Sequence, residues 1–191
     1  LLIVAGSVGY TGAPFLSSEA ALRSGAGLVY LAVPEEIYGV TAQRCVETIC
    51  VPLPSKNGQL CTLSAPEIDR LLEICGVGLI GPGLGGGAAS EEVLRIVRQA
   101  KIPLVIDADG INALAGNIDI LRNRSANTVL TPHDREFERL AGGLPGCDIK
   151  KDGRLAAAKA LASVAGCIVV LKGNTTVTAS PDGRAFISEN G

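Results

Sequence analysis

The sequence predicts a three-layer α/β/α fold around a mainly parallel central sheet, with an antiparallel hairpin near the C-terminus. Strand and helix signals alternate along the 191 residues, joined by short Gly- and Pro-rich links. Hydrophobic residues make up 47% of the chain but aromatic residues only 3%. The core must therefore be built from Val, Ile, Leu and Ala, which is typical of parallel strands that helices cover on both faces.

The N-terminal half contains four expected strands. They are short apolar runs bounded by Gly, Pro or polar residues, over 1–5, 26–34, 47–53 and 77–81. After the first strand, a Gly-rich turn leads to an Ala-rich helix that opens near Ser17 or Ser18 and ends about Gly25. Pro34 and the acids after it favour a second helix. Ser64 and Glu67 match a capping box at the start of a third helix.

The C-terminal half continues the alternation and then changes character. Helices are expected over 90–100, around 111–116, and over 134–142 and 153–166, and strands over 103–109, 127–131 and 167–173. Two last strands, 175–180 and 184–189, flank the turn "PDG" and predict the hairpin. Because no repeat or linker interrupts the pattern, we expect residues 1–191 to belong to one domain. A strand lies at each end, so we expect that domain to be truncated at both ends.

Charge and cysteine content exclude several classes of protein. The formal net charge of −2 gives no general reason to bind nucleic acid or an anionic membrane. No apolar run approaches the roughly 20 residues that cross a bilayer. The six cysteines form no C-x-x-C pair and mostly lie in apolar surroundings. Reduced core cysteines are favoured over disulfides or zinc, and we expect a cytoplasmic protein.

Polar and glycine residues gather where the expected strands end. In open α/β sheets, ligands bind at the carboxyl ends of the strands. The segments that follow these ends are "GSVGYTGAP" (6–14), "GPGLGGG" (81–87), Asp107 to Asn112, Thr131 to Glu136, and Lys172 to Thr176. This placement indicates a ligand site along one edge of the sheet.

Each of these features also has a purely structural interpretation. The two Gly-rich loops can present N–H groups to an anion or can simply form tight turns. Asp107 and Asp109 alternate along the chain, so only one can face a given side, and Asp109 can cap a helix. Asn112 lies one turn further and is a weaker candidate.

The second half of the edge leaves similar alternatives open. Glu136 lies in the first turn of a helix, where the dipole favours an acid regardless of function, although an acid there can also serve Mg²⁺ through water. Lys172 ends a buried strand, so its ammonium needs an anionic partner, a phosphate or an exit to solvent. His133, the only histidine, is either a corner residue or a ligand contact.

Known nucleotide and hydrolase motifs are missing. The sequence lacks the P-loop G-x-x-x-x-G-K-[ST] and G-x-S-x-G, and although "GPGLGG" (81–86) has the spacing G-x-G-x-x-G, no long helix opens directly from it. What remains is the handling of a nucleotide or phosphate without a Walker loop.

An ordered set of motifs resembles one family closely. The motifs are "GSVGYTGAPFLSSEAALRSGAGLV", "GPGLG", "VIDADGINAL", "LTPHDREFERL" and "VVLKGNTTVTASPDG". They are similar to those of NAD(P)H-hydrate dehydratases, ribokinase-like repair enzymes that are often fused to an NAD(P)H-hydrate epimerase. The resemblance implies a ribokinase-like fold. It also implies a reaction in which ADP, or ATP in the eukaryotic branch, drives dehydration of (S)-NAD(P)HX to NAD(P)H. With ADP the other products are AMP and phosphate, and Mg²⁺ assists phosphoryl transfer.

The resemblance also implies roles for individual residues. Ala13, Gly83 and His133 fall at positions that contact the hydrated nicotinamide cofactor. The segment Lys172, Gly173, Asn174, Thr175 and Thr176 falls where the family contacts the nucleotide's phosphates. Glu136 corresponds to the acid linked to Mg²⁺, and Asp107, Asp109 and Asn112 line the same edge.

The sequence departs from the family pattern at its end. Family members continue after "ENG" with a Gly-rich segment that carries the expected catalytic aspartate. We therefore expect that residue beyond Gly191, and we expect the 191 residues alone to be inactive. Two other interpretations stay open: a ribokinase-like kinase for a vitamin precursor, and a nucleotide-binding module without turnover. We also expect a homo-oligomer.

Overall fold

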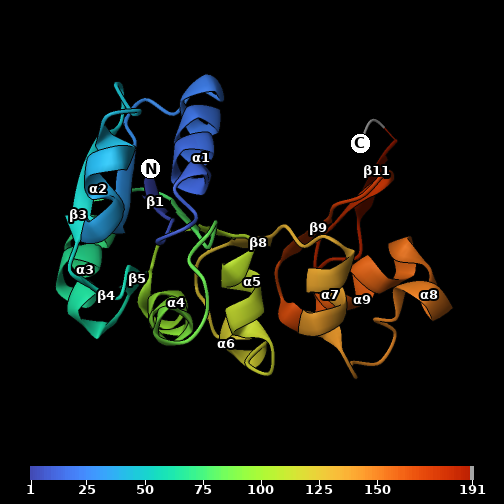
Figure 1. Cartoon of the computed structure of the whole chain (residues 1–191). Helices are drawn as coiled ribbons and strands as arrows, with labels where there is room; N and C mark the ends of the chain where they lie inside the picture. The colour runs from blue at the N-terminus through green and yellow to red at the C-terminus, as the bar shows by residue number, and fades with distance from the viewer. Residues whose placement is uncertain (190–191) are drawn as a thin grey trace.

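The central sheet dominates the computed structural model, which describes residues 1–189. In these residues it has nine strands in the order β11-β10-β9-β8-β7-β6-β1-β2-β3 (Figure 1). The strands are β1 (Leu2–Val4), β2 (Tyr30–Pro34), β3 (Ile49–Leu53), β6 (Gly78–Ile80), β7 (Leu104–Ile106), β8 (Thr128–Leu130), β9 (Ile168–Leu171), β10 (Thr176–Ala179) and β11 (Ala185–Ser188). All neighbours from β3 to β9 are parallel, whereas β10 is antiparallel to both β9 and β11. The predicted sheet and hairpin are confirmed.

Helices lie on both faces of the sheet (Figure 1). They are α1 (Gly12–Arg23), α2 (Glu35–Ala42), α3 (Ala65–Ile74), α4 (Ala88–Gln99), α5 (Asp109–Leu114), α6 (Asp119–Arg122), α7 (Asp134–Ala141), α8 (Ile149–Asp152) and α9 (Arg154–Ala165), with a 3₁₀ turn η1 (Thr62–Ser64). Successive strand residues point to opposite faces. Accordingly, Leu2 and Val4 belong to the buried cluster that includes residues of α3 to α7 and α9, whereas Ile3 belongs to a second cluster with residues of α1 and α2. This two-sided burial explains why β1 is apolar throughout.

The strand order places a topological switch point beside β1, where open α/β sheets form a ligand crevice. From β1 the chain runs outward to β2 and β3, then returns to the other side of β1 with β6 and continues to β9. The order therefore reverses between β1 and β6, and the carboxyl ends of strands at such a switch point are where ligands bind in open α/β sheets. The segments 5–11 and 81–87 follow these two strands.

Two local expectations were wrong, and a small hairpin and the short helices α6 and α8 were not expected. Helix α1 begins at Gly12 rather than near Ser17, because Pro14 falls in the first turn, where its missing N–H costs nothing. Ser64 makes no side-chain cap for α3, since its hydroxyl donates to the carbonyl of Pro54 at 2.6 Å. A small hairpin, β4 (Ser55–Lys56) and β5 (Gln59–Leu60), was missed, although its turn "NG" is a strong hairpin signal.

None of the helices among residues 1–189 has both the length and the apolar character that crossing a bilayer requires. All six cysteines lie in this part of the chain and are free thiols, as expected.

Candidate active site

The two Gly-rich loops meet at the switch point between β1 and β6. The N–H of Gly6 donates to the carbonyl of Pro82 at 2.8 Å. The buried hydroxyl of Ser7 donates to the carbonyl of Gly83, also at 2.8 Å. A β-carbon added to Gly83 would lie 2.9 Å from that of Ala13. The structure thus brings together the two candidate substrate contacts that the sequence placed 70 residues apart.

Close backbone packing explains two glycines of the second loop. Gly83 has φ +68°, and Gly81 has φ +129° with its position for a β-carbon only 1.8 Å from the carbonyl oxygen of Asp107. Only glycine tolerates both conditions. The N–H of Gly85 is already used, because it donates to Oδ2 of Asp109 at 2.9 Å. At these positions the tight-turn interpretation is sufficient.

Asp107 accepts hydrogen bonds from two other residues of this sheet edge. Its Oδ1 accepts from Nζ of Lys172 at 2.6 Å and from the hydroxyl of Thr131 at 2.7 Å. Lys172 thus has the anionic partner that its position at a strand end requires. Its side chain is 42% exposed, so the ammonium still reaches solvent and can meet an anion from outside.

Asp109 faces a different set of partners. The chain turns at Ala108, which has φ +52°, and Asp109 becomes the first residue of α5 without capping it, since Ala108 is the N-cap and makes no side-chain cap. Besides Gly85, its carboxylate accepts from Nδ2 of Asn112 at 3.2 Å. Arg139 in turn donates to Oδ1 of Asn112. Asp109 and Asn112 therefore fix the second Gly-rich loop against α5 and α7.

His133 and Glu136 form a reciprocal cap at the start of α7. Nδ1 of His133 accepts from the N–H groups of Arg135 and Glu136 at 3.1 and 3.3 Å. Oε2 of Glu136 accepts from the N–H of His133 at 2.9 Å, and Oε1 lies 3.3 Å from Nε2 of the ring. Since Nδ1 is an acceptor, we assign the ring proton to Nε2. The side chain of His133 is 52% exposed, so one side of the ring remains open to a ligand.

The segment 172–176 lies directly beside this corner. Lys172 pairs with His133 in an isolated parallel bridge, and its N–H donates to the carbonyl of Pro132 at 2.8 Å. The hydroxyl of Thr176 donates to the carbonyl of Gly173 and accepts from its N–H, at 3.1 and 3.3 Å. The candidate phosphate segment is thus a closed turn next to the candidate substrate histidine, with Asn174 exposed and Thr175 half-buried.

Sequence reasoning missed Arg154, the first residue of α9. Its guanidinium donates to backbone carbonyls around the 172–176 turn and pairs with Asp134. A signal was present, because a cation at a helix N-terminus is opposed by the helix dipole and must find compensation elsewhere.

The arrangement of the acids at this edge fits Mg²⁺ that binds through water rather than by direct coordination. Glu136 is buried and both its oxygens face His133, and Asp107 is paired with Lys172. Residues 1–189 contain no cluster of three or more potential metal ligands. Mg²⁺ commonly binds through water and substrate phosphates, and this arrangement is compatible with that mode. The aspartate expected beyond Gly191 falls outside the described residues.

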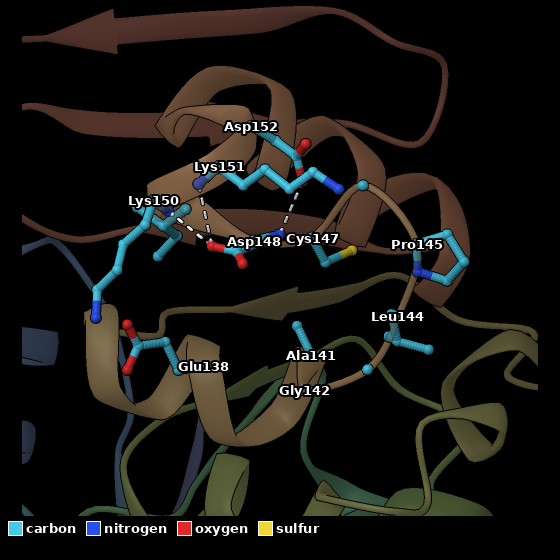
Figure 2. A pocket seen from close by; sticks show the side chains of 13 residues that line it. Glu138, Ala141, Gly142, Leu144, Pro145, Cys147, Asp148, Lys150, Lys151 and Asp152 are labelled. Atoms are coloured by element: carbon cyan, nitrogen blue, oxygen red, sulfur yellow. Dashed lines mark hydrogen bonds between the residues drawn. The ribbon is translucent and has the colours of Figure 1, made fainter.

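Two hollows lie near these elements. One, of about 420 Å³, lies between α1 and the ends of β6 to β8, and Asp107 and Thr131 border it. The other, of about 440 Å³, lies between α7 and α8 and is lined by Glu138 and residues 141–152. Figure 2 shows that Asp148 caps α8, since its Oδ1 accepts from the backbone N–H groups of Lys150 and Lys151 at 2.9 and 3.1 Å. None of the candidate residues lines this second hollow.

Comparison with known proteins gives consistent results. The NAD(P)H-hydrate dehydratase family model matches residues 1–191. The bifunctional NAD(P)H-hydrate repair enzyme Nnr of Gloeobacter violaceus is 41% identical over 192 residues, which cover 100% of this chain and 36% of that protein. The chain thus spans little more than a third of the length of this relative.

Solved structures agree. The ADP/ATP-dependent NAD(P)H-hydrate dehydratase of Bacillus subtilis, co-crystallised with ATP/Mg²⁺, is 29% identical with a TM-score of 0.73, over 98% of this chain and 62% of that one. A ribokinase-like superfamily protein of Enterococcus faecalis is 27% identical with a TM-score of 0.78, over 97% of this chain and 61% of that one. The fold is therefore ribokinase-like, and the chain belongs to the NAD(P)H-hydrate dehydratase family.

Proposed function

We propose that the protein containing this chain repairs hydrated nicotinamide cofactors, dehydrating (S)-NAD(P)HX to NAD(P)H while ADP is converted to AMP and phosphate. The observation that carries the proposal is the adjacency of the two candidate subsites, because the bridge between His133 and Lys172 joins one to the other. Family membership and the co-crystallisation of the Bacillus enzyme with ATP/Mg²⁺ support it. A vitamin-precursor kinase and a non-catalytic module are not better supported.

The residues have distinct proposed tasks. Hydroxide is a poor leaving group, so transfer of a phosphoryl group to the substrate hydroxyl precedes an easy elimination. Ala13, Gly83 and His133 would hold the nicotinamide part of the substrate at the crevice. Lys172 and the turn 173–176 would bind the phosphates. The Lys172 ammonium would stabilise the negative charge on the phosphoryl group during its transfer.

Magnesium would neutralise phosphate charge when bound, and Glu136 is the proposed link to it through water. Asp107 would keep the ammonium of Lys172 aimed at the edge. Asp109 and Asn112 would hold the second Gly-rich loop in place.

Further features of the whole protein belong to the same proposal. Residues 1–191 would be part of one dehydratase domain, and an epimerase domain would be fused to it, as the bifunctional relatives and their length suggest. Free cysteines support a cytoplasmic location. A homo-oligomer stays a prediction, which light scattering on the purified protein would test.

Two measurements test the function. Calorimetry on the 191-residue chain should detect binding of both ADP with magnesium and NADPH. The longer protein that contains this chain should restore the near-ultraviolet absorbance of NADPH from NADPHX only when ADP or ATP is present. Nucleotide-independent recovery, or phosphorylation of a hydroxyethylthiazole-type alcohol in preference to NADPHX, would refute the proposal.

A further inference from the structure

We propose that Arg154 is a positioning residue that shapes the 172–176 turn for phosphate and ties it to the substrate corner at the start of α7. The inference rests on the proposed function, because it assumes that this turn binds the nucleotide. Arg154 would not itself touch either ligand. It would act through the backbone of the turn and through Asp134.

The first argument is the number of carbonyls that Arg154 holds. Its Nη2 donates to the carbonyls of Leu171 and Lys172 at 3.2 and 2.9 Å, and its Nε donates to that of Thr175 at 3.0 Å. A guanidinium presents five donors in a rigid planar fork, so it can fix several carbonyls in one orientation.

Fixing a carbonyl also fixes an N–H group. In a planar trans peptide the C=O and the following N–H point in opposite directions. Drawing the carbonyls of Lys172 and Thr175 toward Arg154 therefore turns the N–H groups of Gly173 and Thr176 away from it, and the N–H of Gly173 donates to the hydroxyl of Thr176, which closes the turn. Phosphate-binding loops need N–H groups, not carbonyl oxygens, on the side of the anion. Without the guanidinium, these carbonyls would be free to turn toward the phosphate and repel it.

Gly173 fits the same arrangement. A β-carbon at this position would lie 2.6 Å from Nη2 of Arg154 and 3.0 Å from its Cζ. Its lack of a side chain lets the guanidinium lie directly against the turn. The glycine of the "KGN" motif and Arg154 thus form one packing unit.

The second argument is the link to α7. Nη1 of Arg154 pairs with Oδ1 of Asp134, the first residue of α7 and the neighbour of His133. The side chain of Arg154 is 25% exposed and that of Asp134 is 54% exposed, so solvent reaches this pair mainly from the side of the aspartate. One side chain therefore contacts both the phosphate turn and the corner that carries the candidate substrate histidine.

The test compares Arg154→Gln with a matched control, Arg124→Gln. Arg124 also holds three backbone carbonyls, those of Val97, Ala100 and Ile102, at 2.6 to 2.9 Å. It does so near the amino ends of β7 and β8, at the opposite edge of the sheet. Both changes should lower thermal stability. Calorimetry with ADP and magnesium should show affinity falling about tenfold or more for Arg154→Gln only, since hydrogen bonds from a charged donor are involved.

Asp134→Asn tests the link to α7 without disturbing the carbonyl contacts. In the wild-type chain, saturating NADPH should raise the affinity for ADP by about fivefold or more, in the usual range for coupled sites. The variant should bind ADP alone within about twofold of the wild type but lose most of this enhancement.

The outcomes separate the two proposals. If the wild-type chain binds no ADP, the proposed nucleotide site and the role of Arg154 both fail. If the wild type binds ADP and Arg154→Gln binds it equally well, only the role of Arg154 fails. An equal loss in Arg124→Gln would also overturn that role, because general destabilisation would then explain the effect. An unchanged NADPH enhancement in Asp134→Asn would overturn the link to α7.

Discussion

Replacing Gly83 by alanine should damage both stability and the crevice between the two Gly-rich loops. Gly83 has φ +68°, and an added β-carbon would lie 2.9 Å from the β-carbons of both Ala13 and Tyr10. Carbon atoms in good contact are about 3.5–4.0 Å apart. The substitution therefore combines a left-handed backbone with a steric overlap, at the point where substrate contact is proposed.

The size of the effect follows from the two terms. A left-handed conformation costs a residue with a β-carbon about 1–2 kcal/mol, and overpacking costs about 1–3 kcal/mol. Gly166 provides a matched control, since it has φ +66° but its added β-carbon would meet nothing closer than 3.8 Å. Gly166→Ala should show the first term alone. The two variants should thus differ by about 1–3 kcal/mol in the free energy of unfolding.

Urea unfolding of both variants measures this difference, and calorimetry with NADPH measures the effect on the crevice. Gly83→Ala should have the lower midpoint and bind NADPH more weakly, whereas Gly166→Ala should bind it as the wild type does. Equal free energies of unfolding for the two variants would refute the overlap argument. Normal NADPH binding by Gly83→Ala would show that the loops do not contact this ligand.

Three further predictions concern other parts of the fold. Lys172→Met removes the cation beside Asp107 and should weaken ADP binding about tenfold, by the loss of a charge-assisted contact; unchanged affinity in calorimetry would contradict the phosphate role. Ala108→Gly should raise the free energy of unfolding by about 1 kcal/mol in urea titrations, because Ala108 has φ +52°, and no gain would mean that local contacts already compensate the strain. Hydrogen bonds from Arg184 and Ser180 lower the pKa of Asp182. The ionised carboxylate therefore stabilises the fold fully at pH values above the ordinary Asp pKa of about 4. This contribution is lost as the pH falls toward the lowered pKa. Thermal unfolding should therefore separate wild type from Asp182→Asn by a constant amount above about pH 5 and by a progressively smaller amount below about pH 4, and a separation that does not shrink below about pH 4 would argue against the shift.

The local sequence pattern was sufficient to predict the fold, because the strand and helix signals are strong and are repeated along the chain. The apolar run of β1 is buried on both faces, and burial on both faces leaves no room for polar alternation. The turn "PDG" and its flanking strands were also sufficient for the hairpin of β10 and β11. The start of α1 was wrong because Gly12 and Pro14 usually mark a turn, whereas here they form the first helical turn.

The parallel sheet, the edge at which the polar residues gather, and the family all follow from the sequence alone, since strand periodicity and ordered motifs can be recognised along the chain. How these residues are paired is visible only in the folded protein. It directs Asp107 to Lys172 and Asp109 to Gly85, and it uses the acid of Glu136 to cap a helix together with His133. It also brings Arg154 from a third segment against the 172–176 turn. Such pairings depend on which strand ends become neighbours, and residues far apart in the chain carry no local signal of that proximity.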